Sequence, residues 1–324
     1  PKGIKPYKGW EDSLLGGHSV GHYLSAAAQA VRATGDEDLK EKLAALISGL
    51  KECQDKLGTG FIFGAQINDP QNVERQFDLI EGKLQGTDHW VPWYNMHKML
   101  TGLVDTYKYT GNEEALEVAK SLGDWIYNRA SKWSKSTNDK VLWTEYGGMN
   151  DCLYELYYYT GDEKYLKSAH KFDQISIFED VASGKADILN QKHANTTIPK
   201  FVGALKRYSV LKAKDELGEG DEQYLEWAEK FFNLAVDKYA YITGGVSVME
   251  HFNKEDKLDG TRNSTNCESC CAHNMLKLAR ELYKLTGEKK YSDYYETTLR
   301  NSIMGAVKAN DNAAAAYFLP MATG

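Results

Sequence analysis

The stretch LVDTYKYTGNEEALEVAKSLGDWI, residues 103–126, decides the fold class of this chain. Apolar residues stand three and four positions apart before and after its centre, which is the pattern of amphipathic helices. The centre is Thr110-Gly111-Asn112. Glycine ends a helix readily in the left-handed conformation, and asparagine can cap the helix that follows. The stretch therefore predicts two helices joined by a tight turn.

The same phrase recurs along the chain, at Thr34-Gly35-Asp36, Thr160-Gly161-Asp162 and Thr286-Gly287-Glu288. Its spacing is too irregular for a solenoid of short fixed period. The longest interval leaves room for one more helical pair, whose second helix would carry Tyr224, Ala228 and Phe231. The chain is therefore expected to be a series of helical hairpins.

Long segments without a clear helical pattern separate these pairs. They span residues 58–89, 131–145, 178–198 and 241–268, and they are rich in His, Trp, Asn and Gly. Loops of such length in a helical domain are usually functional or disordered, and this composition favours function. The pattern predicts an all-α protein, an α/α toroid whose loops build a pocket, with a helical solenoid as the alternative.

Composition limits the possible partners and compartments. The chain has 324 residues with 39 Lys and Arg against 46 Asp and Glu, a net charge of −7, so no nucleic-acid partner is expected. No apolar run is long enough to predict a membrane span. Five cysteines do not make a disulfide framework in a chain of this length. They favour a reducing, cytoplasmic compartment, although secretion stays open because the N-terminus reads as the middle of a sequence.

The segment NCESCCAHNM, residues 266–275, is the densest group of metal-ligating residue types. Thiolate, carboxylate and imidazole all bind zinc, and Glu268 and Cys270 could do so together. The alternative is that these cysteines fill space at the start of a helix. Cys53 and Cys152 lie within helical patterns and are interpreted as buried, inert thiols.

Glu250 follows a glycine-rich loop and precedes His251-Phe252. A carboxyl group in such surroundings can act as a general acid and base, whereas the alternative is a surface glutamate. Four further junctions between loop and helix combine aromatic residues or glycine with polar planar side chains: residues 16–23, 91–97, 143–150 and 191–199. Sugars are held by such mixtures, because flat apolar faces meet C–H groups and polar side chains meet hydroxyls.

These junctions carry a family resemblance. The motifs GHSVGHYLSA (residues 17–26), VPWYNMHK (91–98), TEYGGMN (144–150), HANT (193–196), TGG (243–245), EHF (250–252) and ESC (268–270) keep their order along the chain. Together they resemble the β-L-arabinofuranosidases of glycoside hydrolase family 127 and the related family 146. The resemblance extends from about Gly17 to Pro320.

The resemblance implies an (α/α)6 barrel that forms one catalytic-type domain over residues 1–324. It implies a retaining, exo-acting β-L-arabinofuranosidase that releases L-arabinose from plant-derived arabinofuranosides, with zinc as cofactor and an oligosaccharide or small glycoside as substrate. By the same resemblance Glu250 is the acid/base, and Glu268 and Cys270 are two of the zinc ligands. His97, Glu145, His193 and Asn195 would line the sugar pocket. Oligomeric state is not implied.

The sequence departs from the family at its end. In the family, an adjacent Cys-Cys pair that supplies the thiolate nucleophile and two zinc ligands follows a phrase that corresponds here to Tyr317-Phe318-Leu319-Pro320. That pair is absent from these residues, as are the early barrel residues and the C-terminal β-sandwich domains. We therefore expect little catalysis and weak zinc binding from the 324 residues alone. A sugar epimerase, an unsaturated-glucuronide hydrolase and a non-catalytic carbohydrate-binding domain are the alternatives.

Overall fold

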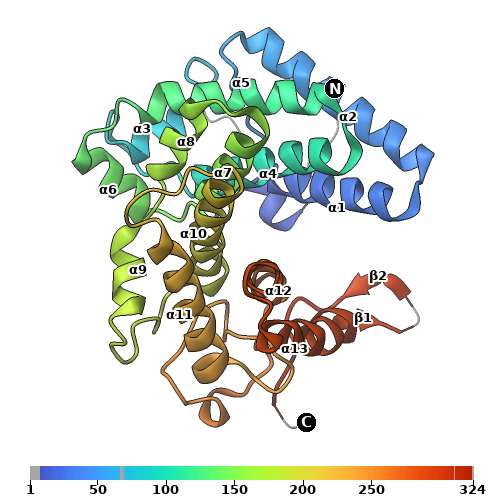
Figure 1. Ribbon diagram of the computed structural model, residues 1–324. Coiled ribbons are helices and arrows are strands. Elements are labelled where there is room, and N and C mark those ends of the chain that lie inside the picture. The colour runs from blue at the N-terminus through green and yellow to red at the C-terminus, as the bar shows by residue number, and fades with distance from the viewer. Residues whose placement is uncertain (1–7, 66–68, 310, 323–324) are drawn as a thin grey trace. The chain divides into compact units, whose positions relative to one another are not determined.

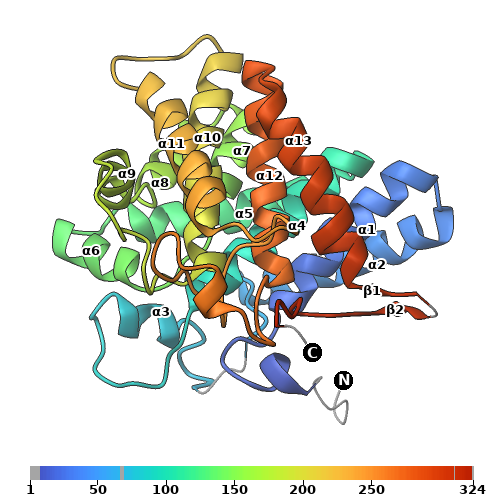
Figure 2. The same cartoon turned by 90° about the horizontal axis from the view of Figure 1, so that it is seen from below.

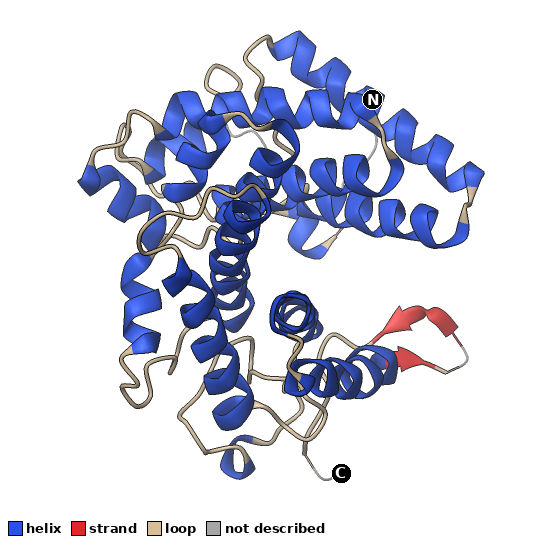
Figure 3. Ribbon diagram, in the orientation of Figure 1, coloured by secondary structure: helices blue, strands red, loops and turns tan. Residues whose placement is uncertain are grey.

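The computed structural model describes residues 8–65, 69–309 and 311–322 of the chain (Figure 1). These residues are mainly helical, and the paired strands among them form one small hairpin (Figure 3). The all-α prediction is confirmed. The N-terminal residues 1–7, which bear on the compartment, lie outside the described residues.

The helices follow one another in pairs with short insertions. They are α1 (His18–Thr34), α2 (Glu37–Leu57), α3 (Arg75–Ile80), α4 (Pro92–Thr110), α5 (Glu113–Ala130), α6 (Lys135–Trp143), α7 (Met149–Thr160), α8 (Glu163–His170), α9 (Ile175–Ala182), α10 (Ala194–Ala213), α11 (Glu222–Tyr239), α12 (Ser269–Thr286) and α13 (Lys289–Thr298). A π-helical turn (Leu299–Ile303), three 3-10 turns (Gly9–Asp12, Asp259–Thr261, Met304–Ala306) and the antiparallel strands β1 (Val307–Lys308) and β2 (Asp311–Ala315) complete the set.

The chain divides into two compact units, Pro1–Phe172 and Asp173–Gly324. Unit 1 holds α1 to α8, and unit 2 holds α9 to α13 with the hairpin of β1 and β2. Within unit 2, α12 and α13 lie side by side in both views (Figures 1 and 2). The expectation of one domain over residues 1–324 stays a prediction.

The repeated Thr-Gly phrase ends one helix and begins the next, as predicted. Gly35, Gly111, Gly161 and Gly287 all have φ between 68° and 71°, and each donates its backbone N–H to the carbonyl four residues before it. The side chain of the next residue then caps the following helix in three of the four pairs: α2, α5 and α8. The phrase therefore fixes where each helix stops and where its partner starts.

The long segments are less irregular than the sequence predicts. The segments 58–89 and 131–145 contain α3 and α6, and α9 overlaps the segment 178–198. Expecting continuous loops there was wrong, because these helices have six to nine residues and are too short for a clear apolar period. One local signal was present: the hydroxyl of Ser134 accepts from the backbone N–H of Thr137 and so caps α6.

Aromatic side chains make up much of the core of each unit. In unit 1 the rings of Phe77 and Trp93 meet edge to face with centroids 4.9 Å apart, and Trp125 packs against both. In unit 2 the rings of Phe201 and Phe231 are stacked 4.0 Å apart at the interface of α10 and α11. Buried rings of this size contribute large apolar areas to stability, which accounts for part of the tyrosine and tryptophan content.

Helix α4 is held close to α1 in unit 1. A Cβ atom at Gly21 would lie 2.1 Å from the carbonyl oxygen of Lys98, so only glycine allows the two backbones to approach this closely. This packing sets the position of the first turns of α4, which carry His97.

A buried arginine fastens α3 to α5. The guanidinium of Arg129 donates from Nε to Glu81 at 2.5 Å, from one terminal nitrogen to Glu74 at 2.5 Å, and from the other to Asp78. The side chain of Arg129 is only 7% exposed and that of Glu81 is fully buried. The charges are therefore mutually dependent, because a buried carboxylate without its cation is strongly unfavourable.

Replacing Arg129 by Ala should lower the free energy of unfolding by about 3 kcal/mol, since the three carboxylates lose their buried cation and keep only the exposed ammonium of Lys83, 2.7 Å from Glu81. Chemical denaturation followed by circular dichroism measures the change. Arg32, exposed on α1, is the matched control, and Arg32→Ala should stay within about 0.5 kcal/mol of the wild type. Equal stability of the Arg129 and Arg32 variants would show that the network contributes nothing.

The two cysteines that were expected to be buried differ in exposure. Cys152 is buried, as predicted, but Cys53 is exposed on α2, so its assignment as a buried thiol was wrong. A cysteine on an amphipathic helix can face either side, and its neighbours Glu52 and Gln54 did not decide which.

Among the described residues, no helix combines the length and the apolar character that a bilayer crossing requires.

Candidate active site

Glu268 immediately precedes α12 in unit 2 and is the most deeply buried acidic residue of the site. Its side chain is 0% exposed. One oxygen accepts from the hydroxyl of Tyr317 at 2.9 Å, and the other accepts from the thiol of Cys271 at 3.1 Å. Burial raises the pKa of Glu268, and the hydrogen bonds from Cys271 and Tyr317 only partly oppose this. Both oxygens are therefore held in fixed positions.

Three cysteines surround this carboxylate in the chain, and they differ in exposure. Cys267 and Cys271 are buried, and burial raises the pKa of the Cys267 thiol to about 11 and that of Cys271 well above its ordinary value. Cys270 is partly exposed and close enough to Glu268 for a side-chain hydrogen bond. Cys267 and Cys271 therefore fill space in the interior, whereas Cys270 is accessible to a ligand.

Glu250 lies in a strained two-residue turn. Val248 and His251 exchange two backbone hydrogen bonds of 2.9 and 3.0 Å, and the residues between them, Met249 and Glu250, have φ of 46° and 69°. Tight hairpin turns with two such residues normally use Asn-Gly, because side chains disfavour positive φ. Strain of this kind concentrates at functional sites, and here it determines the direction of the Glu250 side chain.

Backbone bonds bring this turn to the segment before α12. The N–H of Met249 donates to the carbonyl of Thr265 at 2.9 Å, and the N–H of Cys267 donates to that of Ser247 at 3.1 Å. The hydroxyl of Tyr317 then contacts both acids, at 2.8 Å from Glu250 and 2.9 Å from Glu268. Burial raises the pKa of Tyr317, and so do the two carboxylates, so its hydroxyl stays protonated.

The start of α10 completes the group in unit 2. The N–H of Ala194 donates to the carbonyl of Glu250 at 2.8 Å, and the imidazole of His193 lies 3.9 Å from the Glu250 carboxylate. The ring of His193 also stacks on that of His251. Asn195 is buried and accepts from the side chain of Asn274 on α12 at 3.0 Å. The structure therefore brings His193, Asn195 and Glu250 to one place.

The remaining candidates, His97 and Glu145, belong to unit 1. His97 is 4% exposed, and its Nδ1 accepts from the backbone N–H of Gly148 at 3.1 Å. At Gly147, where φ is 59°, a Cβ atom would lie 2.7 Å from that same nitrogen. The glycines of the motif let its backbone reach the imidazole, and Glu145 stands half-buried two residues earlier. The junctions at residues 16–23 and 91–97 also meet, because the side-chain amide of Asn95 donates to the carbonyl of Gly16 at 2.6 Å.

The donors in unit 2 match part of a zinc site. Glu268 offers a buried carboxylate and Cys270 offers an accessible thiol beside it, and both are zinc ligands by chemistry. Among the described residues, however, no group of three or more His, Cys, Asp and Glu side chains has the geometry of a metal site. The two donors therefore fit a zinc ion without completing its ligand set.

Tyr317 is the functional candidate that the sequence did not single out. It lies 49 residues after Glu268 and 67 residues after Glu250, in a segment noted only for its Tyr-Phe-x-Pro phrase. No local pattern connects a tyrosine to carboxylates so distant in the chain. The backbone contact of Ser269 N–H with the carbonyl of Tyr317, at 3.0 Å, is what brings the two segments together.

Comparisons with solved structures first define the class of fold. A GH127 β-arabinofuranosidase superposes with a TM-score of 0.71 at 20% identity, covering 98% of this chain and 49% of the other. A GH127 β-L-arabinofuranosidase from Geobacillus stearothermophilus T6 gives 0.70 at 17% identity, covering 99% and 51%. A sugar epimerase from a ruminal bacterium gives 0.58 at 12%, covering 98% and 84%. These likenesses show the fold, which is that of the α/α-barrel proteins, as predicted.

The family follows from the sequence itself. Residues 1–324 match the family described as β-L-arabinofuranosidase, GH127 catalytic domain. The chain therefore belongs to glycoside hydrolase family 127, and the predicted resemblance is confirmed. No curated protein matches it. The chain spans about half the length of the two GH127 structures to which it is similar.

Proposed function

We propose that this protein is a retaining, exo-acting β-L-arabinofuranosidase that releases L-arabinose from plant-derived arabinofuranosides. One observation supports this most: in a chain of the GH127 family, two carboxylates, Glu250 and Glu268, share the hydroxyl of Tyr317 next to the accessible thiol of Cys270. The two acids differ in their surroundings, because Glu250 is 28% exposed while Glu268 is fully buried. Different surroundings give paired carboxylates different roles.

Glu250 is the proposed acid/base. Its partial exposure lets it reach a bound glycoside and a water molecule in turn, as a retaining glycosidase requires. It donates a proton to the leaving oxygen when the glycosidic bond breaks, and it then removes a proton from the water that completes hydrolysis. The Tyr317 hydroxyl and the strained turn hold its carboxylate in one orientation between these two steps.

Zinc is the proposed cofactor, with Glu268 and Cys270 as two of its ligands. When bound, it would keep a cysteine sulfur in the thiolate form, which is the nucleophilic form. The resemblance places that cysteine and the remaining ligands in a Cys-Cys pair after Pro320. Tyr317 and Cys271 hold the carboxylate of Glu268 in position for a metal ion.

The sugar would be held by planar polar side chains. His193 and Asn195 belong to the segment that contacts Glu250, and they would contact hydroxyls near the bond that breaks. His97 and Glu145 are the proposed contacts from unit 1. The half-buried positions of His193 and Glu145 let both reach a ligand while packing limits their motion. The substrate would be a small arabinofuranoside or an oligosaccharide.

The direct test is hydrolysis of 4-nitrophenyl β-L-arabinofuranoside by the intact protein. We expect release of 4-nitrophenol, with the β anomer of arabinofuranose appearing first in the proton NMR spectrum, because a retaining enzyme keeps the anomeric configuration. The α-linked isomer serves as the control and should be cleaved far more slowly. No hydrolysis of either isomer, or first appearance of the α anomer, would contradict the proposal.

A further inference from the structure

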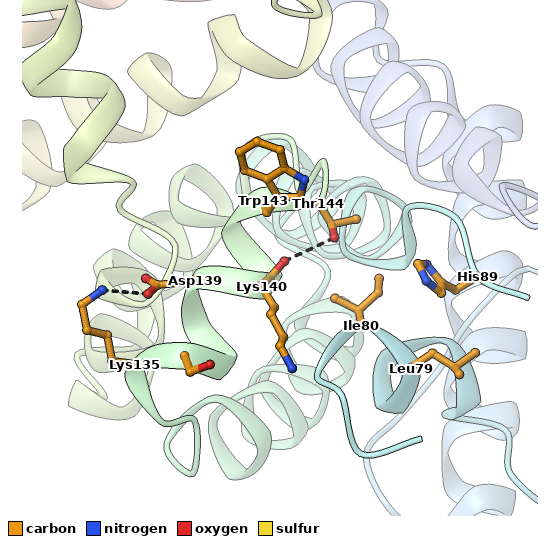
Figure 4. A pocket seen from close by; sticks show the side chains of 9 residues that line it. Leu79, Ile80, His89, Lys135, Asp139, Lys140, Trp143 and Thr144 are labelled. Atoms are coloured by element: carbon orange, nitrogen blue, oxygen red, sulfur yellow. Dashed lines mark hydrogen bonds and ion pairs between the residues drawn. The ribbon is translucent and has the colours of Figure 1, made fainter. Parts of the chain in front are cut away.

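A groove of about 730 Å³ opens in unit 1 alongside α6 (Figure 4). Two rows of α6 side chains line it, each with a spacing of four residues: Lys135, Asp139 and Trp143 in one row, and Ser136, Lys140 and Thr144, the residue after the helix, in the other. Residues four apart lie on the same face of a helix, so one whole face of α6 is turned to the groove.

The opposite wall comes from α3 and the segment after it. Leu79 and Ile80, which are 7% and 5% exposed, form an apolar surface, and His89 lies beside them (Figure 4). The Arg129 network fixes α3 to α5, so this wall belongs to a rigid part of unit 1. The groove thus has an apolar wall facing a polar one.

Trp143 is the most exposed tryptophan of the described residues, at 89%, compared with 55% for Trp10 and 39% for Trp90. Tryptophan has a large apolar surface, and leaving it in water forgoes the stabilisation that burial would give. Single exposed apolar residues are common, but this one stands at the edge of a groove (Figure 4). Its ring offers a flat apolar face to a ligand.

Polar groups complete the lining. The ammonium of Lys135 and the carboxylate of Asp139 lie 2.7 Å apart, with side chains 88% and 57% exposed. Because both side chains are exposed, their donors and acceptors are accessible to a ligand. An exposed pair of this kind adds little to stability, so rearranging it on binding costs little. Lys140 and His89 add two further polar side chains. A sugar ring combines apolar C–H faces with hydroxyls. A flat aromatic face suits the C–H groups, and the neighbouring carboxylate and ammonium groups can bind the hydroxyls.

We propose that this groove is a carbohydrate subsite, which binds a neutral sugar residue of the substrate's glycan chain with one ring face on Trp143 and hydroxyls bonded to Asp139 and Lys135. The subsite proposal rests on the proposed function only in the identity of the glycan that binds. The chain connects the groove with the candidate pocket residues of unit 1, since Thr144 in its wall directly precedes Glu145. An all-apolar ligand is disfavoured, because it would bury the charged wall without partners.

The test measures binding of a neutral linear arabino-oligosaccharide to the intact protein by titration calorimetry. Glu250→Gln is the background in every sample, so the ligand is not consumed. Adding Trp143→Ala should raise the dissociation constant at least about tenfold, since aromatic anchors carry much of the affinity at such sites. Trp143→Phe, which keeps a flat ring, should recover most of the affinity. Tyr283→Ala, which removes an exposed aromatic residue from α12, should leave the constant unchanged.

Activity measurements distinguish failure of the subsite proposal from failure of the proposed function. In the otherwise unmodified protein, Trp143→Ala should lower the ratio of kcat/KM on the oligosaccharide to kcat/KM on the 4-nitrophenyl glycoside. Failure of the wild type to hydrolyse either compound would refute the arabinofuranosidase, while calorimetry would still decide the subsite. The subsite is refuted if the oligosaccharide does not bind, or if Trp143→Ala and Tyr283→Ala bind it equally well.

Discussion

Replacing Glu250 by Gln should lower kcat on an unactivated β-L-arabinofuranoside by about 10³-fold, because general acid/base catalysis typically contributes 10²- to 10⁴-fold. The amide keeps the size of the side chain and can still contact the Tyr317 hydroxyl, but it can neither donate the proton to the leaving oxygen nor accept one from water. The loss should be smaller on the 4-nitrophenyl glycoside, whose leaving group needs little protonation. Steady-state kinetics on the two substrates measure the difference.

Glu255 provides the matched control for this variant. It lies in the same loop, and its carboxylate accepts from the backbone N–H of Asp187 at 2.8 Å, a bond that glutamine can keep. Glu255→Gln should therefore retain nearly full activity. If both variants retain activity, Glu250 is not the acid/base. If Glu250→Gln loses the same factor on both substrates, its role in protonating the leaving group is wrong.

Removing the Cys270 thiol should weaken zinc binding by the intact protein more than about 100-fold, since loss of groups that merely support metal ligands already costs 10- to 100-fold. Zinc content after dialysis, measured by mass spectrometry, should fall from about one ion per chain in the wild type to a small fraction in Cys270→Ala. Cobalt substitution gives an independent measure. The thiolate absorption band of the cobalt protein should weaken in Cys270→Ala, because one sulfur ligand is gone.

Cys53 is the control for this experiment. It is exposed on α2 in unit 1, so Cys53→Ala removes a thiol without touching the candidate ligands. That variant should hold as much zinc as the wild type. Equal zinc content in Cys270→Ala and the wild type would remove Cys270 from the ligand set. A Cys270→Ala variant that loses zinc but keeps full activity would separate the metal from catalysis.

The helical frame could be predicted from the sequence because its signals are local. Thr-Gly followed by an acidic or amide residue can end one helix and cap another within a few positions. In the structure the phrase ends a helix at all four places, and its third residue caps the next helix at three of them. The short helices α3 and α6 were missed because six and nine residues are too few to show a clear apolar period. Helix α3 is also held by a residue distant in the chain, since the guanidinium of Arg129 binds the carboxylates in and around it.

The candidate site could be predicted only as separate motifs. Each motif was visible in the sequence, and the backbone bonds of Ala194 and Met249 confirm that the 193–195 and 250–252 motifs lie together with the segment before α12. The contribution of Tyr317 could not be predicted, because it depends on the fold of residues between 270 and 317. The same holds for the exposure of Cys270 and the burial of Cys271, which are neighbours in the chain.

The Thr-Gly turns have a consequence for how such a chain can change over evolutionary time. In these hairpins the two-residue turn joins the partners at one end, so the long segments that carry the candidate residues emerge at the other end. Mutations in those segments leave the signals that stop and start the helices untouched. The turns that define the helical frame and the segments that carry the candidate residues can therefore change independently of one another. A fold shared at a TM-score of 0.70 with only 17% identity is what such a separation allows.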